Sequence, residues 1–245
     1  MVERQPIGGV VEKFIFDVDG TLTPSRGKID KKFGAWFHKF CEYPNHDVYL
    51  VTGSDRSKTI EQLGVPIYHV CKRVYNCSGC DVYEGDRNLR SSSWVLPDLA
   101  RDFLDQCLYE SDWPTLTGLH IEERCGMVNF SVVGRNADSI DRKAYYEYDK
   151  MYSERVKIAT AFNTMFPDLL ASVAGETGMD ISAKGNDKSQ ILKDFDDKDR
   201  IFFFGDKVGV GGNDFLLAQA LEEWTHGVSL HVRDWKDTWK ALKGL

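Results

Sequence analysis

The chain has 245 residues, of which 42% are hydrophobic and 28% are charged, a composition that builds a folded core and excludes a disordered chain. Its length suits one large domain or two modest ones. The formal net charge of −7 disfavours nucleic acid and anionic membranes as partners, although local positive charge can still bind a small anion.

The sequence also bears on location and redox state. The first nine residues lack the apolar run of a signal peptide, and no stretch reaches membrane-spanning length, so we expect a cytoplasmic protein without a membrane partner. Its six cysteines are then expected to be reduced. Cys77 and Cys80 have a spacing found in zinc sites, but no second pair or histidine stands at ligand spacing, which makes zinc the less favoured interpretation.

A short apolar run near the start of the chain ends in two carboxylates. Phe14 to Phe16, with Val10 and Val11 upstream, predicts a strand buried on both faces, and Asp17 and Asp19 follow it. Strand alternation points both side chains the same way at the carboxyl end, where open α/β sheets bind ligands. Such a pair suits Mg²⁺, and it allows one aspartate to act as nucleophile while the other transfers protons. A plain acidic corner is the alternative.

The first third of the chain continues as alternating helices and strands. Asp30 is expected to cap a helix over 29–40, and Gly53 and Ser54 follow a second buried strand. The glycine allows close backbone approach and the serine hydroxyl can donate to an oxyanion, although an ordinary turn explains both equally well. The further elements expected are a strand over 46–51, a helix over 56–64, a strand over 67–74 and a hairpin over 81–86.

From about Arg87 the pattern changes to α+β, and the α/β pattern returns at Lys188. The expected elements between them are a helix over 97–110, a hairpin over 120–133, helix over 138–166, and strands over 169–173 and 179–181. After Lys188 we expect a helix over 189–195, strands over 200–205 and 228–232, and a closing helix over 234–242.

Three buried strands thus end in residues that can bind a ligand, since Asp206 and a glycine-rich loop follow the strand over 200–205. Such ends lie side by side in a doubly wound sheet, and this predicts one phosphoryl-transfer site. The expected catalytic groups are Asp17 as nucleophile and Asp19 as acid/base. The expected Mg²⁺ ligands and phosphate-binding residues are Asp17, the Asp19 carbonyl and Asp206 for the metal, Asn213 and Asp214 as its supporting shell, and Ser54 with Lys188 for the phosphoryl oxygens.

Three arginines stand out in the middle segment of an otherwise acidic chain. Arg124, Arg135 and Arg142 could form a second phosphate pocket, because arginine binds phosphate bidentately and keeps its charge when partly buried. Surface ion pairs with Glu122, Glu123, Asp138 and Asp141 are the equal alternative.

With these residues assembled, the chain resembles the haloacid dehalogenase superfamily and, within it, the eukaryotic-type α-phosphomannomutases. The superfamily motifs are DVDGTLT from Asp17, Gly53-Ser54, Lys188, and the run from Gly205-Asp206 to Gly212-Asn213-Asp214. The narrower resemblance lies in TPSRGK with Arg26, GMVNFSVVGR ending at Arg135, DRKAYYEYDK from Asp141, and FFGDKVGVGGND.

The resemblance implies a doubly wound core over 1–85 and 185–245, with an inserted α+β cap over 86–184. It implies interconversion of mannose 6-phosphate and mannose 1-phosphate through a phosphorylated Asp17 and a hexose bisphosphate. Mg²⁺ is the implied cofactor, a hexose 1,6-bisphosphate the implied activator, and a homodimer the implied assembly. The implied substrate-binding residues are Arg26, Arg124, Arg135 and Arg142 for the distal phosphate and Asp180 for sugar hydroxyls.

The chain departs from the family pattern at Gly178, where the family has a serine two residues before the cap aspartate. The segments 68–81 and 175–185 also match loosely. A phosphatase of the same superfamily, which passes the phosphoryl group to water, is the alternative function. A non-catalytic sugar-phosphate-binding protein is disfavoured because Asp17 and Asp19 are both present.

Overall fold

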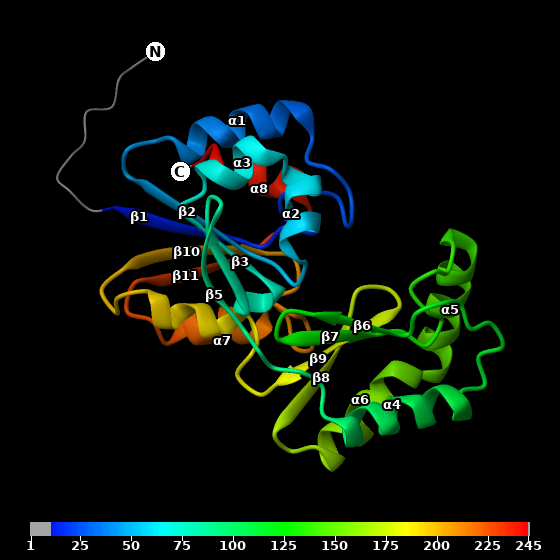
Figure 1. Ribbon diagram of the computed structural model, residues 1–245. Coiled ribbons are helices and arrows are strands. Elements are labelled where there is room, and N and C mark those ends of the chain that lie inside the picture. Colours follow the sequence, from blue (N-terminus) through cyan, green and yellow to red (C-terminus); the bar gives the residue numbers. More distant parts are fainter. Residues whose placement is uncertain (1–10, 245) are drawn as a thin grey trace. The chain divides into compact units, whose positions relative to one another are not determined.

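The computed structural model describes residues 11–244. Val10, which was expected just before the first strand, and the first nine residues, which were expected to carry no signal peptide, lie outside the described residues. The chain divides into two compact units (Figure 1). Among the described residues, one contains 11–90, Lys188–Gly209 and 214–244. The other contains Ser91–Asp187 and the short segment Val210–Asn213.

The first unit is built on a seven-stranded sheet in the order β11-β10-β1-β2-β3-β4-β5. Its strands are β1 (Glu12–Phe16), β2 (His46–Val51), β3 (Arg73–Asn76), β4 (Asp81–Glu84), β5 (Arg87–Ser91), β10 (Arg200–Gly205) and β11 (Gly227–His231). The pairs from β11 to β3 are parallel, whereas β3 and β4 are antiparallel. The predicted α/β fold with a parallel sheet is therefore confirmed.

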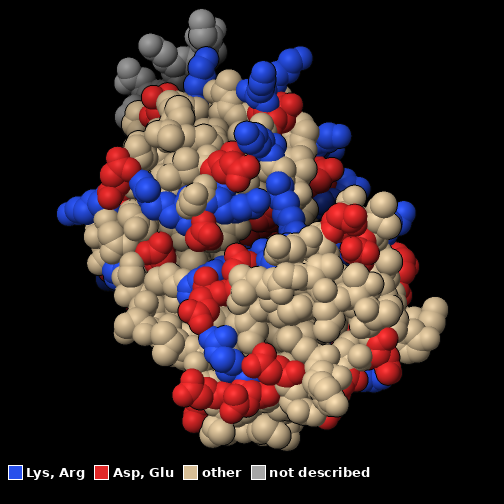
Figure 2. All heavy atoms as spheres, turned by 45° about the vertical axis from the view of Figure 1, so that its right-hand side comes forward, with Lys and Arg blue, Asp and Glu red and all other residues tan. Residues whose placement is uncertain are grey.

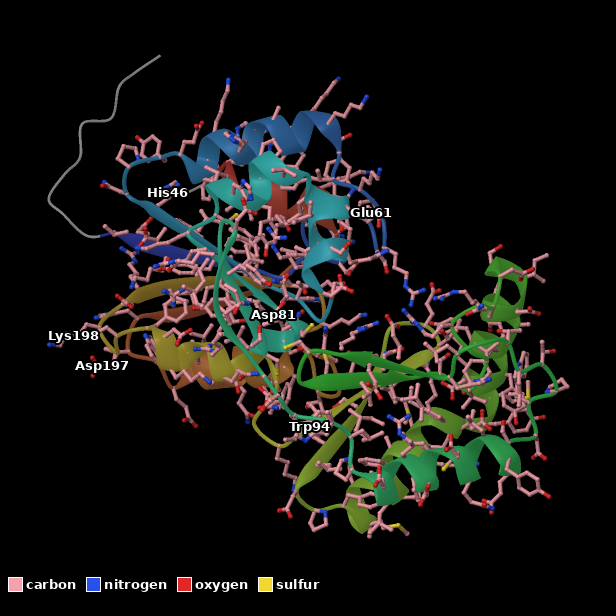
Figure 3. The ribbon with its side chains drawn as sticks, in the orientation of Figure 1. His46, Glu61, Asp81, Trp94, Asp197 and Lys198 are labelled. Carbon is pink, nitrogen blue, oxygen red and sulfur yellow. The ribbon has the colours of Figure 1, made fainter. Side chains whose placement is uncertain are left out.

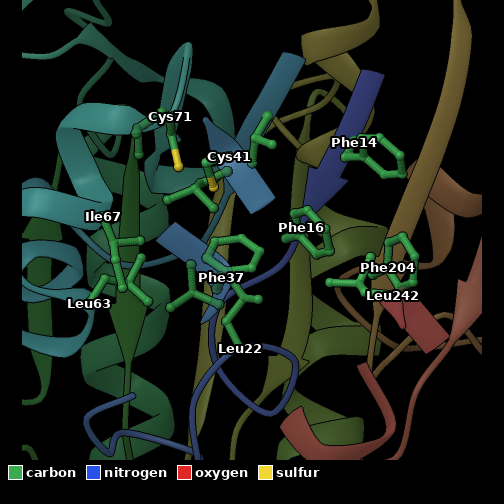
Figure 4. Close-up of a cluster of buried hydrophobic side chains, with 14 of the residues drawn as sticks. Phe14, Phe16, Leu22, Phe37, Cys41, Leu63, Ile67, Cys71, Phe204 and Leu242 are labelled. Atoms are coloured by element: carbon green, nitrogen blue, oxygen red, sulfur yellow. The ribbon is translucent and has the colours of Figure 1, made fainter. Parts of the chain in front are cut away.

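Helices cover both faces of this sheet. They are α1 (Lys31–Cys41), α2 (Arg56–Leu63), α3 (Val65–Val70), α7 (Phe215–Glu222), α8 (Trp235–Leu242) and the 3-10 helices η1 (Cys77–Gly79) and η2 (Lys188–Asp194). Phe14 and Phe16 pack into a core with side chains of α1, α3 and α8 (Figure 4). Ile15 faces the other way, into a core with η2 and α7. Burial on both faces is why the central strands are continuously apolar.

Three sequence expectations for this unit need correction. The predicted strand over 67–74 is wrong, because α3 occupies its first half and β3 begins only at Arg73. Pro66 stands in the first helical turn, where a missing N–H costs nothing, and the buried residues Ile67, Tyr68 and Cys71 have helical spacing. The predicted helix over 189–195 is the 3-10 helix η2, and α7 was not predicted.

The second unit has a four-stranded antiparallel sheet in the order β6-β7-β9-β8. Its elements are α4 (Asp98–Glu110), β6 (Ile121–Arg124), β7 (Met127–Phe130), α5 (Ser139–Tyr152), α6 (Glu154–Met165), β8 (Leu169–Ala174) and β9 (Gly178–Ala183). The predicted helix over 138–166 is in fact two helices. Ser153, with φ of 54° in the left-handed region, ends α5 and precedes α6.

The surface carries charges of both signs. On the face drawn in Figure 2, acidic and basic side chains are interspersed, in keeping with a modest net charge of −7. Over residues 11–244, no helix combines the length and the apolar character needed to cross a membrane.

Candidate active site

The predicted site residues of the first unit follow three neighbouring strands. Asp17 comes directly after β1, Asp206 directly after β10, and Ser54 three residues after β2. The sheet order places β1 between β10 and β2, and the Asp17 N–H donates to the Phe204 carbonyl at 2.9 Å, which extends the strand pairing to the site. The parallel arrangement therefore brings these strand ends to one edge of the sheet.

Lys188, at the start of η2, is buried among carboxylates at this edge. Its Nζ donates to Asp17 Oδ1 at 2.5 Å and to Asp214 Oδ1 at 2.6 Å. Carboxylate oxygens of Asp17, Asp206 and Asp214 all lie within 4.8 Å of one another. Asp214 thus belongs to the carboxylate cluster itself, and its second oxygen accepts the Lys207 N–H at 3.1 Å.

Burial dominates the electrostatics of this cluster. It raises the pKa of Asp17 to about 8 against the opposing charge of Lys188, and Asp214 and Asp206 raise it further. Burial also raises the pKa of Asp206. For Lys188, burial favours the neutral amine, but the carboxylates of Asp17 and Asp214 outweigh it and raise the lysine pKa. One ammonium thus faces three carboxyl groups, and a further cation would relieve their repulsion.

The donor set fits a hard divalent cation such as Mg²⁺, which prefers oxygen ligands. Gly20 has a φ of +84°, and a Cβ there would collide with the Asp206 carboxylate, so the backbone approaches that group as only glycine can. Asn213 Oδ1, next to Asp214 in sequence, is buried and has no hydrogen-bond partner within the described part of the chain. A water bound to a cation is the type of donor such an oxygen accepts.

Asp19 and Ser54 make hydrogen bonds of their own outside the carboxylate cluster, through the side chain of Asp19 and through the backbone of Ser54. Asp19 Oδ1 accepts the Arg26 N–H at 2.5 Å and Gln62 Nε2 at 2.9 Å. The Ser54 N–H donates to Thr52 Oγ1 at 3.1 Å, and the Ser54 carbonyl accepts the Cys77 N–H at 2.9 Å. Gln62 was not predicted; the available signal is a glutamine on the buried face of α2.

In the second unit, two of the three arginines of the middle segment pair with Glu122, and the third, Arg142, lies 3.6 Å from Glu176 Oε2. Arg135 Nε lies 2.5 Å and Arg124 Nη2 3.1 Å from Glu122 Oε2. Burial lowers the pKa of Arg135, as do the charges of Arg124 and Arg142, while Glu122 opposes them. Ion pairs are therefore present, with Glu122 as predicted for Arg124 and Arg135, whereas the second phosphate pocket stays a prediction. The predicted partner Glu123 instead pairs with Arg101.

Asp180, on β9, lies beside this arginine group through Asn129 on β7. Asn129 Nδ2 donates to Asp180 Oδ1 at 2.7 Å, and Asn129 Oδ1 accepts Arg135 Nη1 at 3.3 Å. A Cβ at Gly178 would lie 2.8 Å from Asn129 Nδ2, so the glycine leaves space that the amide uses. Asn129 was not predicted, although it stands inside the GMVNFSVVGR motif.

Comparisons with known proteins agree in family. The model of the eukaryotic phosphomannomutase family matches residues 42–245. The phosphomannomutase of Saccharomyces cerevisiae is 35% identical, over 94% of this chain and 92% of its own length. That of Encephalitozoon cuniculi is 32% identical, over 94% of this chain and 91% of its own length. That of Glycine max is 31% identical and covers 100% of this chain, including the strand that leads to Asp17.

Solved structures share the fold at low sequence identity. The C-terminal domain of Candida albicans trehalose-6-phosphate phosphatase has a TM-score of 0.66 at 15% identity, covering 94% of this chain and 91% of that one. Plasmodium falciparum IMP-nucleotidase has a TM-score of 0.62 at 14% identity, covering 96% and 68%. These likenesses bear on the fold alone. The family model and the sequence relatives together show that the chain belongs to the eukaryotic phosphomannomutase family.

Proposed function

We propose that this chain is an Mg²⁺-dependent phosphomannomutase that interconverts mannose 6-phosphate and mannose 1-phosphate through a phosphorylated Asp17. The observation that carries the proposal is the buried cluster of three carboxylates around Lys188, at the strand ends of a member of this family. Relatives at 30–35% identity are named phosphomannomutases, which supports the substrate.

We assign the metal to Asp17, the Asp19 carbonyl and Asp206, with Asn213 and Asp214 as supporting groups. When bound, Mg²⁺ would neutralise the repulsion between the carboxylates and the phosphoryl oxygens. Lys188 and Ser54 would hold phosphoryl oxygens from the protein side. The buried ammonium of Lys188 already contacts the nucleophile, and it therefore also keeps the Asp17 carboxylate oriented.

Asp17 and Asp19 divide the chemistry. The phosphorylated Asp17 gives its phosphoryl group to a free hydroxyl of the hexose monophosphate, and Asp19 takes the hydroxyl proton, which yields the bisphosphate. In the return step an Asp17 oxygen bonds to the other phosphorus, the bond from that phosphorus to the sugar oxygen breaks, and Asp19 returns the proton to that oxygen. A trace of hexose 1,6-bisphosphate would supply the first phosphoryl group.

We further propose that the core, 1–85 with 185–245, performs this chemistry while the cap, 86–184, holds the rest of the substrate. A mutase must retain a phosphate at the end of the sugar that is not reacting. Arg124, Arg135 and Arg142, together with Arg26 of the core, would bind that phosphate bidentately, and Asp180 would accept sugar hydroxyls. This assignment is supported by the shared contact of Arg124 and Arg135 with Glu122 and by the influence of the Arg142 charge on Arg135. The homodimer and the cytoplasmic location remain predictions.

The test is ³¹P NMR of the purified protein with Mg²⁺, mannose 1-phosphate and a trace of hexose 1,6-bisphosphate. We expect the mannose 6-phosphate signal to grow while no free phosphate appears. With Asp17→Asn we expect no mannose 6-phosphate signal. Unchanged turnover by Asp17→Asn would overturn the mechanism.

A sugar-phosphate phosphatase is the second candidate, and Gly178 favours it because the serine hydroxyl of the family pattern is missing from the cap. Growth of inorganic phosphate alone in the same experiment would identify that activity, because the phosphoryl group on Asp17 would then pass to water.

A further inference from the structure

Gln62 occupies a buried position of α2 where an apolar residue is the usual choice. The buried residues of this helix are Thr59, Gln62 and Leu63, and Gln62 is only 2% exposed. A buried glutamine must satisfy an amide and a carbonyl, so its presence requires polar partners. None of the family motifs described above includes this residue.

The amide of Gln62 is surrounded by acceptors. Its Nε2 lies 2.9 Å from Asp19 Oδ1, 3.3 Å from the Gly27 carbonyl and 3.4 Å from Thr23 Oγ1. The reverse orientation would set Oε1 against the Asp19 carboxylate and a carbonyl, so these neighbours fix the nitrogen toward Asp19. Oε1 is then buried without a hydrogen-bond partner among residues 11–244, which costs stability. Stability alone therefore does not account for a glutamine here.

The second donor to Asp19 comes from the turn that follows β1. The Arg26 N–H lies 2.5 Å from the same oxygen, Oδ1, on a residue whose φ is 57°. Both donors thus bind Oδ1. Because an oxygen that accepts two hydrogen bonds is the carbonyl-like oxygen of a carboxylic acid, a proton on Asp19 is carried by Oδ2.

We propose that Gln62 is a positioning residue for the acid/base, which holds Asp19 by Oδ1 so that Oδ2 carries the transferred proton. The inference rests on the proposed function. In the step it serves, an Asp17 oxygen bonds to phosphorus and the bond from phosphorus to the sugar oxygen breaks. The Oδ2 proton moves to that sugar oxygen, and in the reverse direction Oδ2 takes the proton back.

The test compares two phosphoryl donors with different leaving groups. When hexose 1,6-bisphosphate gives up its phosphoryl group, the leaving group is a sugar oxygen that needs a proton. When acetyl phosphate does so, the leaving group is acetate, which needs none. Gln62→Met keeps the side-chain volume and removes the amide. We expect the rate of Asp17 phosphorylation by the bisphosphate to fall by about ten- to a hundred-fold, which is part of a typical acid/base contribution. The rate with acetyl phosphate and the KM for the bisphosphate should change little.

Two further variants keep the result interpretable. Gln62→Glu is nearly isosteric and replaces the donor by an acceptor, so it should show the same selective loss if Gln62→Met folds poorly. Thr59→Val is the matched control, because Thr59 is buried on the same helix and its Oγ1 donates to the Asp55 carbonyl and to Asn76 Oδ1. It should affect both donors equally.

The outcomes separate the two levels of inference. Equal slowing with both donors, or no slowing, in the Gln62 variants would overturn the positioning role while the proposed function stands. Failure of the bisphosphate to phosphorylate Asp17 in the unaltered protein would overturn the proposed function, and the role of Gln62 with it.

Discussion

Lys188 Nζ lies 2.5 Å from Asp17 Oδ1, and both side chains are almost completely buried, with 1% and 4% of their surface exposed. The lysine comes from η2 and the aspartate from the end of β1, so this contact joins segments 171 residues apart in the chain. It fixes Asp17, the proposed nucleophile, to the part of the first unit that follows the second unit in sequence.

Lys188→Met should destabilise the protein strongly. Removing one partner of a buried ion pair leaves an uncompensated charge and costs about 3–5 kcal/mol. We expect a lower midpoint of urea unfolding and no detectable phosphorylation of Asp17. Lys193→Met, an exposed lysine of the same helix, should change the free energy of unfolding by about 0.5 kcal/mol or less. Similar midpoints for the two variants would contradict the importance of the buried pair.

Asp206→Asn should change the response to Mg²⁺. Without metal the variant should be at least as stable as the unaltered protein, because burial and the charge of Asp214 both oppose ionisation of Asp206. A ligand at about a hundred times its Kd stabilises by about 2.7 kcal/mol, and Asp206→Asn should lose most of that gain. Thermal unfolding in EDTA and in saturating Mg²⁺ measures both effects.

Asp197→Asn serves as the control for metal binding, since Asp197 is an exposed residue before β10 (Figure 3). It should retain the full gain in Tm with Mg²⁺. An equal gain in Asp206→Asn would remove Asp206 from the proposed ligand set.

Arg135→Met should weaken substrate binding without impairing the nucleophile. A charge-assisted hydrogen bond contributes about 1.5–3 kcal/mol, so KM for mannose 1-phosphate should rise by about ten- to a hundred-fold. Phosphorylation of Asp17 by acetyl phosphate should be unchanged, because that donor has no distal phosphate. Arg101→Met, which removes the partner of Glu123, should leave KM unchanged. Loss of acetyl phosphate labelling in Arg135→Met would contradict a role limited to the distal phosphate.

The position of Asp17 and Asp206 at neighbouring strand ends could be predicted from the sequence. Continuous apolar runs identify buried parallel strands, and such strands align their carboxyl ends, so residues that follow them must meet. The placement of Asp214 within the carboxylate cluster could not be predicted, because it depends on how the loop after β10 folds back on Lys188.

Contacts made between elements far apart in sequence were also not predictable. The local signals of Gln62 and Asn129, a polar residue on a buried helix face and a place inside a motif, do not reveal their partners. Gln62 contacts Asp19 across 43 residues of chain, and Asn129 contacts Asp180 across 51. Helix α3 was missed for a local reason. Its six residues are too few for periodicity to separate helix from strand. Pro66 does not decide between them, because it indicates a first helical turn only if the segment is already taken as a helix.

His46 gives the protein a defined pH dependence of stability. It lies at the start of β2 (Figure 3), where its Nδ1 is 3.0 Å from the Phe40 carbonyl and its ring packs against Phe14 and Phe40. Burial lowers its pKa below the ordinary value of 6.5. The unfolded chain then binds more protons than the folded one as pH falls through 6.5, so His46 contributes stability above that pH and loses it below.

Urea unfolding at pH 7.5 and 5.5 should therefore show a smaller loss of stability on acidification in His46→Gln than in the unaltered protein. His226→Gln is the control, because His226 is an exposed histidine that precedes β11. An unchanged pH dependence in His46→Gln would show that His46 is not a source of the acid sensitivity.

Gly178→Ser tests whether the missing cap serine can simply be restored. A Cβ at this position lies 2.8 Å from Asn129 Nδ2, so the added side chain must displace the amide that joins Asp180 to Arg135. Inserting atoms into a packed region costs about 1–3 kcal/mol. We expect a lower Tm and a several-fold higher KM for mannose 1-phosphate, rather than an improved enzyme.

The cause can be isolated with Asn129→Ala, which removes the obstructing amide. In a double-mutant cycle, the Tm cost of Gly178→Ser should be smaller in the Asn129→Ala background, because the two residues share one space. Additive costs would show that the amide does not limit position 178. A Gly178→Ser variant with a lower KM and less release of free phosphate would instead mean that this chain accommodates the family serine, and that Gly178 itself relaxes its specificity.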